Sequence, residues 1–188
     1  MQNRLIALFN ALGARFDKEP YFEGVALDET ATGIRLAEWT AANYTAEKAY
    51  AGLKRIMLGL RTAFPTTMTL QFINFFSGAS AQDGAAKIAG LIQYANQIGM
   101  GIGGPDVHVG GTEPSYPYFT TYNGSMPLTA AVQWEDYGWV SPTGSVATVP
   151  AILDYARRKL HLNYIFWLQK NPEFATQVVP LIRKSGAP

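Results

Sequence analysis

Two pairs of adjacent carboxylates are the residues in this sequence best suited to chemistry. Asp28 and Glu29 form one pair, and Glu135 and Asp136 form the other. Each pair follows an apolar, β-prone stretch of the kind that forms a buried strand. Two carboxyl groups from different strands, facing one cleft, are the minimum equipment for hydrolysing a glycosidic bond. The alternative is that these strands end at the protein surface, where carboxylates are soluble and common.

Polar and aromatic residues near other predicted strand ends are candidates for binding a sugar. Asn74 is placed to hydrogen-bond a hydroxyl group, and Trp134 or Trp167 to stack on a sugar ring. Asp106 and His108 follow a glycine-rich strand. They line the site or stabilise their own loop; helping to hold a metal is the weaker alternative for this pair.

The sequence carries no motif for a cofactor. Cysteine is absent, and the two histidines, His108 and His161, are far apart without a metal-ligand spacing. The glycine-rich stretch lacks the order that binds dinucleotides, and no serine nucleophile elbow is present. We therefore expect no cofactor and no metal.

Composition indicates a single domain over residues 1–188 with a large buried fraction. Hydrophobic residues make up 48% of the chain, charged residues 15%, and the net charge is +1. This charge gives no electrostatic basis for binding nucleic acid or an anionic membrane surface, and no apolar run reaches the ~20 residues of a membrane span. The N-terminus reads as an amphipathic helix and not as a signal peptide, so cytoplasmic is the default location.

The elements that must position these residues alternate between strands and helices, which predicts an α/β fold. The first helix has Leu5, Ile6, Leu8, Phe9 and Leu12 on one face and Gly13 as its C-cap, and Thr45 and Thr148 cap two later helices. An irregular excursion covers residues 109–126. The predicted strands are 22–27, 68–76, 99–104, 128–134 and 162–168, with further helices near 83–97 and 172–182.

Five strands are fewer than a closed barrel needs. An eight-fold β/α barrel typically takes about 250 residues, and this chain has 188. The pattern leaves two alternatives open, an open doubly wound sheet and a piece of a barrel.

The strand ends resemble those of the C-terminal half, strands four to eight, of a clan A glycoside hydrolase, a group of retaining (β/α)8-barrel enzymes. In that clan the acid/base Glu ends the fourth strand and the nucleophilic Glu ends the seventh. The resemblance implies that Glu29 is the acid/base and Glu135 the nucleophile, with Trp167 near the aromatic position of the eighth strand. One departure is Asp28, where the clan usually has Asn.

The resemblance implies a truncated, TIM-type β/α barrel of about five parallel strands with flanking helices. Such a sheet has open edges, so we expect completion by oligomerisation, as a homodimer with two-fold symmetry. The first functional hypothesis is a glycoside hydrolase-like protein. The second is a non-catalytic carbohydrate-binding or structural remnant, and a third is an open α/β sheet of unrelated function.

Overall fold

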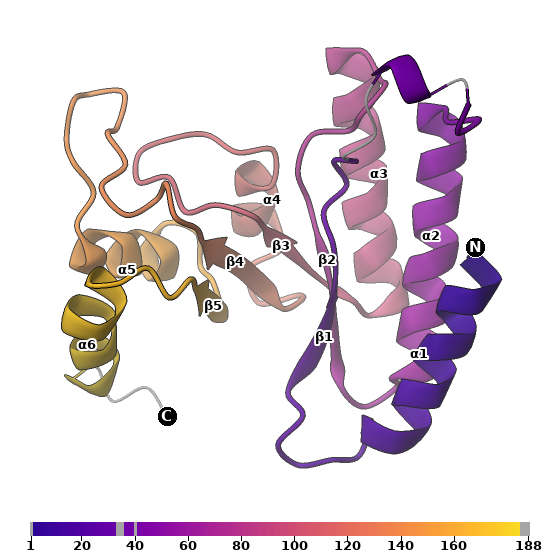
Figure 1. The fold of residues 1–188 in the computed structure, drawn as a ribbon, viewed down its shortest axis with the longest axis horizontal. Helices are drawn as coiled ribbons and strands as arrows, with labels where there is room; N and C mark the ends of the chain where they lie inside the picture. The colour runs from indigo at the N-terminus through magenta and orange to yellow at the C-terminus, as the bar shows by residue number, and fades with distance from the viewer. Residues whose placement is uncertain (1, 33–35, 40, 185–188) are drawn as a thin grey trace. The chain divides into compact units, whose positions relative to one another are not determined.

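A five-stranded sheet organises the fold (Figure 1). The structure is a computed structural model and describes residues 2–32, 36–39 and 41–184. The sheet order follows the chain, β1-β2-β3-β4-β5. The strands are β1 (Gly24–Leu27), β2 (Met68–Phe72), β3 (Gly101–Gly104), β4 (Leu128–Val132) and β5 (Tyr164–Trp167).

The strand order confirms the predicted fold class. The sheet is parallel, with Leu27 opposite Gln71 in the β1–β2 pair and Val132 opposite Trp167 in the β4–β5 pair. Consecutive parallel strands as neighbours are the order of a β/α-barrel segment, whereas a doubly wound sheet reverses its order at a switch point. The fold is therefore an α/β partial barrel of five strands with flanking helices.

Side-chain caps explain where several helices begin. Thr45 and Thr148 accept backbone hydrogen bonds at the starts of α2 (Ala46–Ala63) and α5 (Val149–Arg158), which confirms both predicted caps. Ser80 caps α3 (Ala81–Ile98) in the same way, so this helix begins two residues before the predicted Asp83. None of the described helices is both long and apolar enough to cross a membrane. The helices are α1 (Gln2–Phe16), α2 (Ala46–Ala63), α3 (Ala81–Ile98), α4 (Tyr116–Thr121), α5 (Val149–Arg158) and α6 (Val179–Lys184), with short turns η1 (Leu36–Glu38) and η2 (Phe174–Val178).

The chain divides into two compact units. The first comprises Met1–Ile102 and Gly124–Pro127, and the second comprises Gly103–Asn123 and Leu128–Pro188. In the first unit, α1, α2 and α3 lie along the same side of β1 and β2 (Figure 1). Apolar side chains from these elements form its core, which includes Met57, Leu60, Phe64, Leu70, Leu91 and Ile92.

Gly13 does not cap α1, contrary to the sequence prediction. The helix continues to Phe16, and Gly13 faces the end of α2. A Cβ atom at this position would overlap the carbonyl oxygen of Ala63 and lie 2.8 Å from its carbonyl carbon. The glycine is therefore required for the close approach of two helices and not for a left-handed turn.

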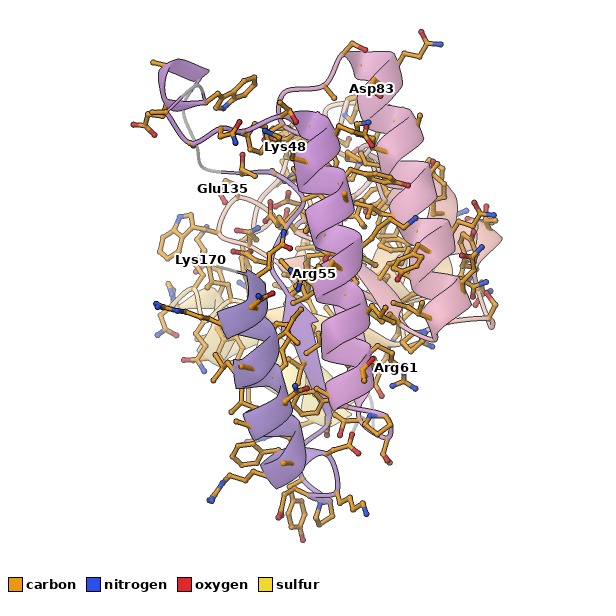
Figure 2. The ribbon with its side chains drawn as sticks, turned by 90° about the vertical axis from the view of Figure 1, so that its right-hand side faces the viewer. Lys48, Arg55, Arg61, Asp83, Glu135 and Lys170 are labelled. Carbon is orange, nitrogen blue, oxygen red and sulfur yellow. The ribbon has the colours of Figure 1, made fainter. Side chains whose placement is uncertain are left out.

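Side-chain hydrogen bonds of Asp17 and Arg61 stabilise the connection between α2 and β2. The Oδ1 atom of Asp17 accepts hydrogen bonds from the backbone N–H groups of Thr66 and Thr67, both at 2.9 Å. Arg61, at the end of α2 in Figure 2, donates to the carbonyl oxygens of Phe64 at 2.9 Å and Thr67 at 3.2 Å. These bonds give partners to backbone groups in the short connection between α2 and β2.

Buried side chains from β4, α4 and α5 make up much of the core of the second unit. Four of the five residues of β4 are buried, and α5 is strongly amphipathic. The edge strand β5 is much less covered, since each of its residues is exposed or half-buried. Buried residues of this unit include Phe119, Leu128, Val132, Ile152, Ala156 and Val178.

Candidate functional site

Glu29 and Asn74 meet at the carboxyl ends of β1 and β2 in the first unit. The Asn74 Nδ2 atom donates a hydrogen bond to Glu29 Oε2 at 2.7 Å. Thr30 fixes the backbone beneath this pair, because its hydroxyl donates to Asn74 O at 2.8 Å and accepts from Asn74 N at 2.9 Å. The half-buried Glu29 carboxylate is therefore held in one direction.

Asp28 serves the backbone at the end of β1. Its Oδ1 atom accepts a hydrogen bond from the Glu29 N–H at 2.9 Å. Its carbonyl oxygen accepts from Nε2 of the buried Gln71 side chain at 2.6 Å. The exposed Asp28 thus helps to position Glu29, and its carboxylate remains open to a ligand on one side.

The residues after β4 point in different directions. Trp134 and Glu135 are exposed, whereas Asp136 is fully buried. Lys170 lies over the Trp134 indole, with Nζ 5.0 Å from the ring centroid, and donates to Trp134 O at 3.3 Å. Figure 2 labels Glu135 and Lys170. The exposed Trp134 and Glu135 can contact a ligand, whereas the buried Asp136 carboxylate belongs to the cluster around His108.

Trp167 contributes to an aromatic group next to Lys170. Its ring centroid lies 6.3 Å from that of Tyr137, in a tilted arrangement. The Tyr137 hydroxyl donates to Leu168 O at 2.7 Å, and burial raises the pKa of Tyr137 to about 12. In this half-buried setting Trp167 is supported by protein contacts, while Trp134, at 55% exposure, presents the larger free surface.

Asp106 and His108 come together with Asp136 in the second unit. One ligand atom from each of these three side chains lies within 4.8 Å of the others. His108 stands between two carboxylates: its Nδ1 atom lies 2.5 Å from Glu113 Oε1, and its Nε2 atom lies 3.2 Å from Asp136 Oδ1. The indole of Trp139 stacks on the imidazole at 3.8 Å and 18°.

The two oxygens of Asp136 have different roles. Oδ2 accepts hydrogen bonds from the N–H groups of Val107 at 3.0 Å and Gln133 at 2.7 Å. Oδ1 is buried, has no hydrogen-bond partner among the described residues and lies 3.2 Å from His108 Nε2. Burial raises the pKa of Asp136, although the two N–H groups and the nearby His108 act in the opposite direction.

Tyr116 fixes the backbone on which Asp106 and His108 stand. Its hydroxyl accepts from the His108 N–H at 2.8 Å and donates to Asp106 O at 3.2 Å. Burial raises the pKa of the Tyr116 phenol, so this hydroxyl keeps its proton. A hollow of about 290 Å³ beside it is lined by Glu113, Tyr155 and neighbouring residues.

The structure groups the predicted site residues within each unit. Asp28, Glu29 and Asn74 meet in the first unit, and Asp106 meets His108 in the second. The prediction did not include Glu113, Trp139 or Lys170. The only sequence signals for these three were their types and their positions in polar loops. The remaining predicted residues, Trp134, Glu135 and Trp167, lie in the second unit. Trp134 contacts Lys170, and Trp167 contacts Tyr137.

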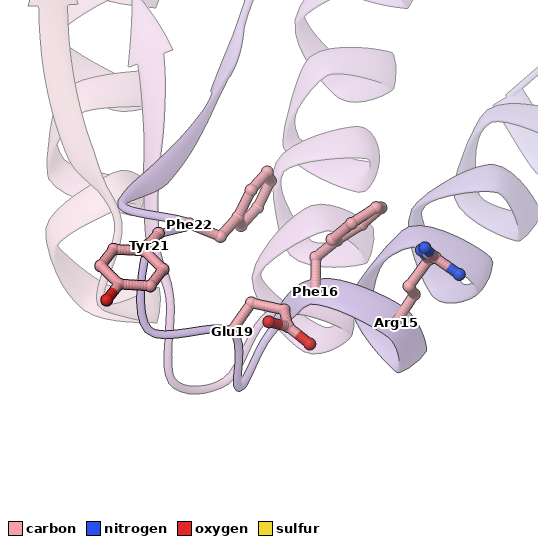
Figure 3. Close-up of a pocket in the computed structure, with 5 residues that line it drawn as sticks. All are labelled: Arg15, Phe16, Glu19, Tyr21 and Phe22. Carbon is pink, nitrogen blue, oxygen red and sulfur yellow. The ribbon is translucent and has the colours of Figure 1, made fainter.

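A separate pocket of about 610 Å³ lies in the first unit (Figure 3). It is lined by the end of α1 and by the connection to β1, including Arg15, Phe16 and Tyr21. Because these residues precede β1, the pocket lies at the opposite end of this strand from Glu29. None of the predicted site residues lines it.

Comparisons of the chain with protein-family models, with curated proteins and with solved structures find no match.

Proposed function

We propose that this chain is a glycoside hydrolase-like protein in which Glu29 is the acid/base and Glu135 the nucleophile. The observation that carries the proposal is the hydrogen bond from Asn74 to Glu29, which orients a carboxyl group at the carboxyl end of a parallel strand. The resemblance of the strand-end residues to clan A glycosidases supports the same assignment.

The proposed reaction uses the two carboxyl groups in turn. Glu29 protonates the glycosidic oxygen while the Glu135 carboxylate attacks the anomeric carbon. The bond between this carbon and the glycosidic oxygen breaks, the aglycone leaves as an alcohol, and a glycosyl ester of Glu135 forms. Glu29 then removes a proton from water, which attacks the same carbon and releases Glu135. A retaining mechanism of this kind requires carboxyl groups about 5 Å apart.

Single substitutions to glutamine test the reaction. We expect E29Q and E135Q each to lower kcat/KM on a panel of aryl glycosides by at least about 100-fold, the lower end of a general acid–base contribution. The matched control is E23Q, because Glu23 is exposed and precedes β1. Absence of turnover by the unaltered chain, or full activity of either variant, would refute the proposal.

A non-catalytic carbohydrate-binding function is the alternative that one observation favours. The Trp134 indole is 55% exposed and is held in place by Lys170, as a sugar-stacking platform should be. In this case W134A loses oligosaccharide binding, measured by calorimetry, whereas E29Q and E135Q still bind and no chain hydrolyses the ligand.

Two-fold self-association belongs to the same proposal. The edge strand β5 supports it, since Tyr164 and Phe166 are 38% and 46% exposed and Leu168, directly after the strand, is 48% exposed. An uncovered apolar edge is a surface that proteins normally pair or protect. Light scattering after size exclusion should give twice the chain mass of 20.6 kDa at micromolar concentration, and a monomer would contradict self-association.

A further inference from the structure

We propose that Asp106, His108 and Asp136 bind a divalent transition-metal ion, with Zn²⁺ as the ion that best fits the donor set. All three residues belong to the second unit, so the site needs nothing from the first. The inference does not depend on the glycosidase proposal, because neither Glu29 nor Glu135 takes part. From the sequence, the spacing of Asp106 and His108 suggested a metal only as the weaker alternative, and the distance to the second histidine led us to expect no metal. The fold adds Asp136 as a third ligand that no sequence spacing indicates.

The distances match a tetrahedral zinc site. Zinc binds histidine nitrogen and carboxylate oxygen at about 2.0–2.2 Å, which places two ligand atoms of a tetrahedron about 3.4 Å apart. The His108 Nε2 and Asp136 Oδ1 atoms are 3.2 Å apart. A carboxylate oxygen of Asp106 lies within 4.8 Å of one ligand atom of each of these two side chains, so side-chain movements of about 1.4 Å bring a pair at this limit to the tetrahedral separation.

Asp136 is the independent sign that a ligand belongs here. The side chain is fully buried, yet its Oδ1 atom has no hydrogen bond among the described residues. A buried carboxylate oxygen without a partner is costly. The hydrogen bonds from Val107 and Gln133 to Oδ2 hold the carboxylate so that Oδ1 faces His108. A cation between them satisfies this oxygen.

The contacts on the other side of His108 suit a metal ligand. Glu113 lies 2.5 Å from Nδ1 and accepts the proton there, which leaves Nε2 for the metal. A carboxylate behind a ligating imidazole fixes the tautomer and the ring direction, and such partners typically change metal affinity about 10–100-fold. Stacking of Trp139 on the ring further restricts its rotation.

The site has both an unbalanced charge and an entry path. Glu113 and Asp136 place two negative charges against one imidazole, so a divalent cation balances the charge better than the imidazole alone. The His108 and Glu113 side chains are each 15% exposed, which allows an ion to enter. Three protein ligands leave a fourth position for water or a ligand oxygen.

Calorimetric titration of the chelator-treated full chain with ZnCl₂ tests the site. We expect one Zn²⁺ per chain, with affinity at least tenfold weaker in D106N and in H108Q. We expect E113Q to weaken it by about 10–100-fold. The matched control is H161N, which removes the other histidine and keeps a residue that accepts its left-handed φ of 55°. D106N changes a half-buried side chain by one atom type, so it tests the site even if H108Q fails to fold.

Imidazole ¹⁵N spectra identify the ligand directly, because the chain has two histidines. Zinc should shift the Nε2 signal of His108 and leave His161 unchanged. The proposal is overturned if no Zn²⁺ binds, if D106N binds as tightly as the unaltered chain, or if H161N abolishes binding and the His161 signal moves.

Discussion

Replacement of Gly13 by alanine tests the packing of α1 on α2. The added Cβ would lie 2.8 Å from the carbonyl carbon of Ala63, where 3.4–4 Å is ordinary contact, and it would overlap the carbonyl oxygen. Backbone atoms cannot rotate away, so the helices must separate. Overpacking costs about 1–3 kcal/mol, and alanine returns about 1 kcal/mol of helix propensity. With a backbone clash the upper end applies, and G13A should lower the unfolding free energy by about 2 kcal/mol.

The assay is urea and thermal unfolding followed by circular dichroism. A loss of about 2 kcal/mol corresponds to a Tm lowered by roughly 4–8 °C in a chain of this size. G52A is the matched control, because a Cβ on Gly52 in α2 meets the flexible end of the Gln2 side chain and no backbone. G52A should be neutral or stabilising by up to about 1 kcal/mol. If G13A is as stable as the unaltered chain, the helix–helix contact is not as close as the structure indicates.

Three further predictions concern caps and titrating groups. Burial of Asp17 acts to raise its pKa, but hydrogen bonds from the backbone of Thr67 and Thr66 hold this pKa below its ordinary value. The stability that the ionised Asp17 contributes is present above about pH 4 and is lost as the pH falls. In D17N, the urea concentration at the unfolding midpoint should therefore depend less on pH on the acid side. Burial raises the pKa of Tyr137 to about 12, so this group should stabilise the fold below its unfolded pKa of about 10 and cease to do so as the pH rises to 12. The pKa values of Tyr116 and Tyr155 are raised as well, so ultraviolet titration should show several late tyrosines, of which Y137F removes the one that titrates near pH 12. T148A should destabilise the start of α5 by about 1 kcal/mol in chemical unfolding, because the threonine hydroxyl caps this helix.

Local signals predicted most elements but not α4 (Tyr116–Thr121), which lies inside the segment 109–126 that was expected to be irregular. Thr45 and Thr148 marked two helix starts because their hydroxyls satisfy N–H groups within the same short segment. The β-prone runs marked all five strands, although β2 ends at Phe72 and not at residue 76. Gly13 was misinterpreted because its reason lies in Ala63, about fifty positions away, and no local pattern reports such a contact.

The site was less predictable because its contacts join loops. Asn74 was predicted to lie at a strand end and to bind a sugar hydroxyl group, and its hydrogen bond to Glu29 was not predicted. The two side chains meet because neighbouring parallel strands bring their carboxyl ends together. Glu113 lies in the irregular segment after β3. No helical or strand periodicity there predicts which way its side chain points. Its approach to His108 depends on the bonds of Tyr116 to the loop backbone.

The side chains after β4 point in opposite directions, so a buried residue that supports the fold and exposed residues that can contact a ligand share one loop. Asp136 holds two loop segments together through Val107 and Gln133. Few substitutions of Asp136 should therefore be found among the folded variants of a mutational library. Trp134 and Glu135 face outward and should accept many residue types without loss of expression. Variation at these two positions can therefore change what the surface recognises while the loop keeps its shape, which makes this loop a natural starting point for selecting new specificities.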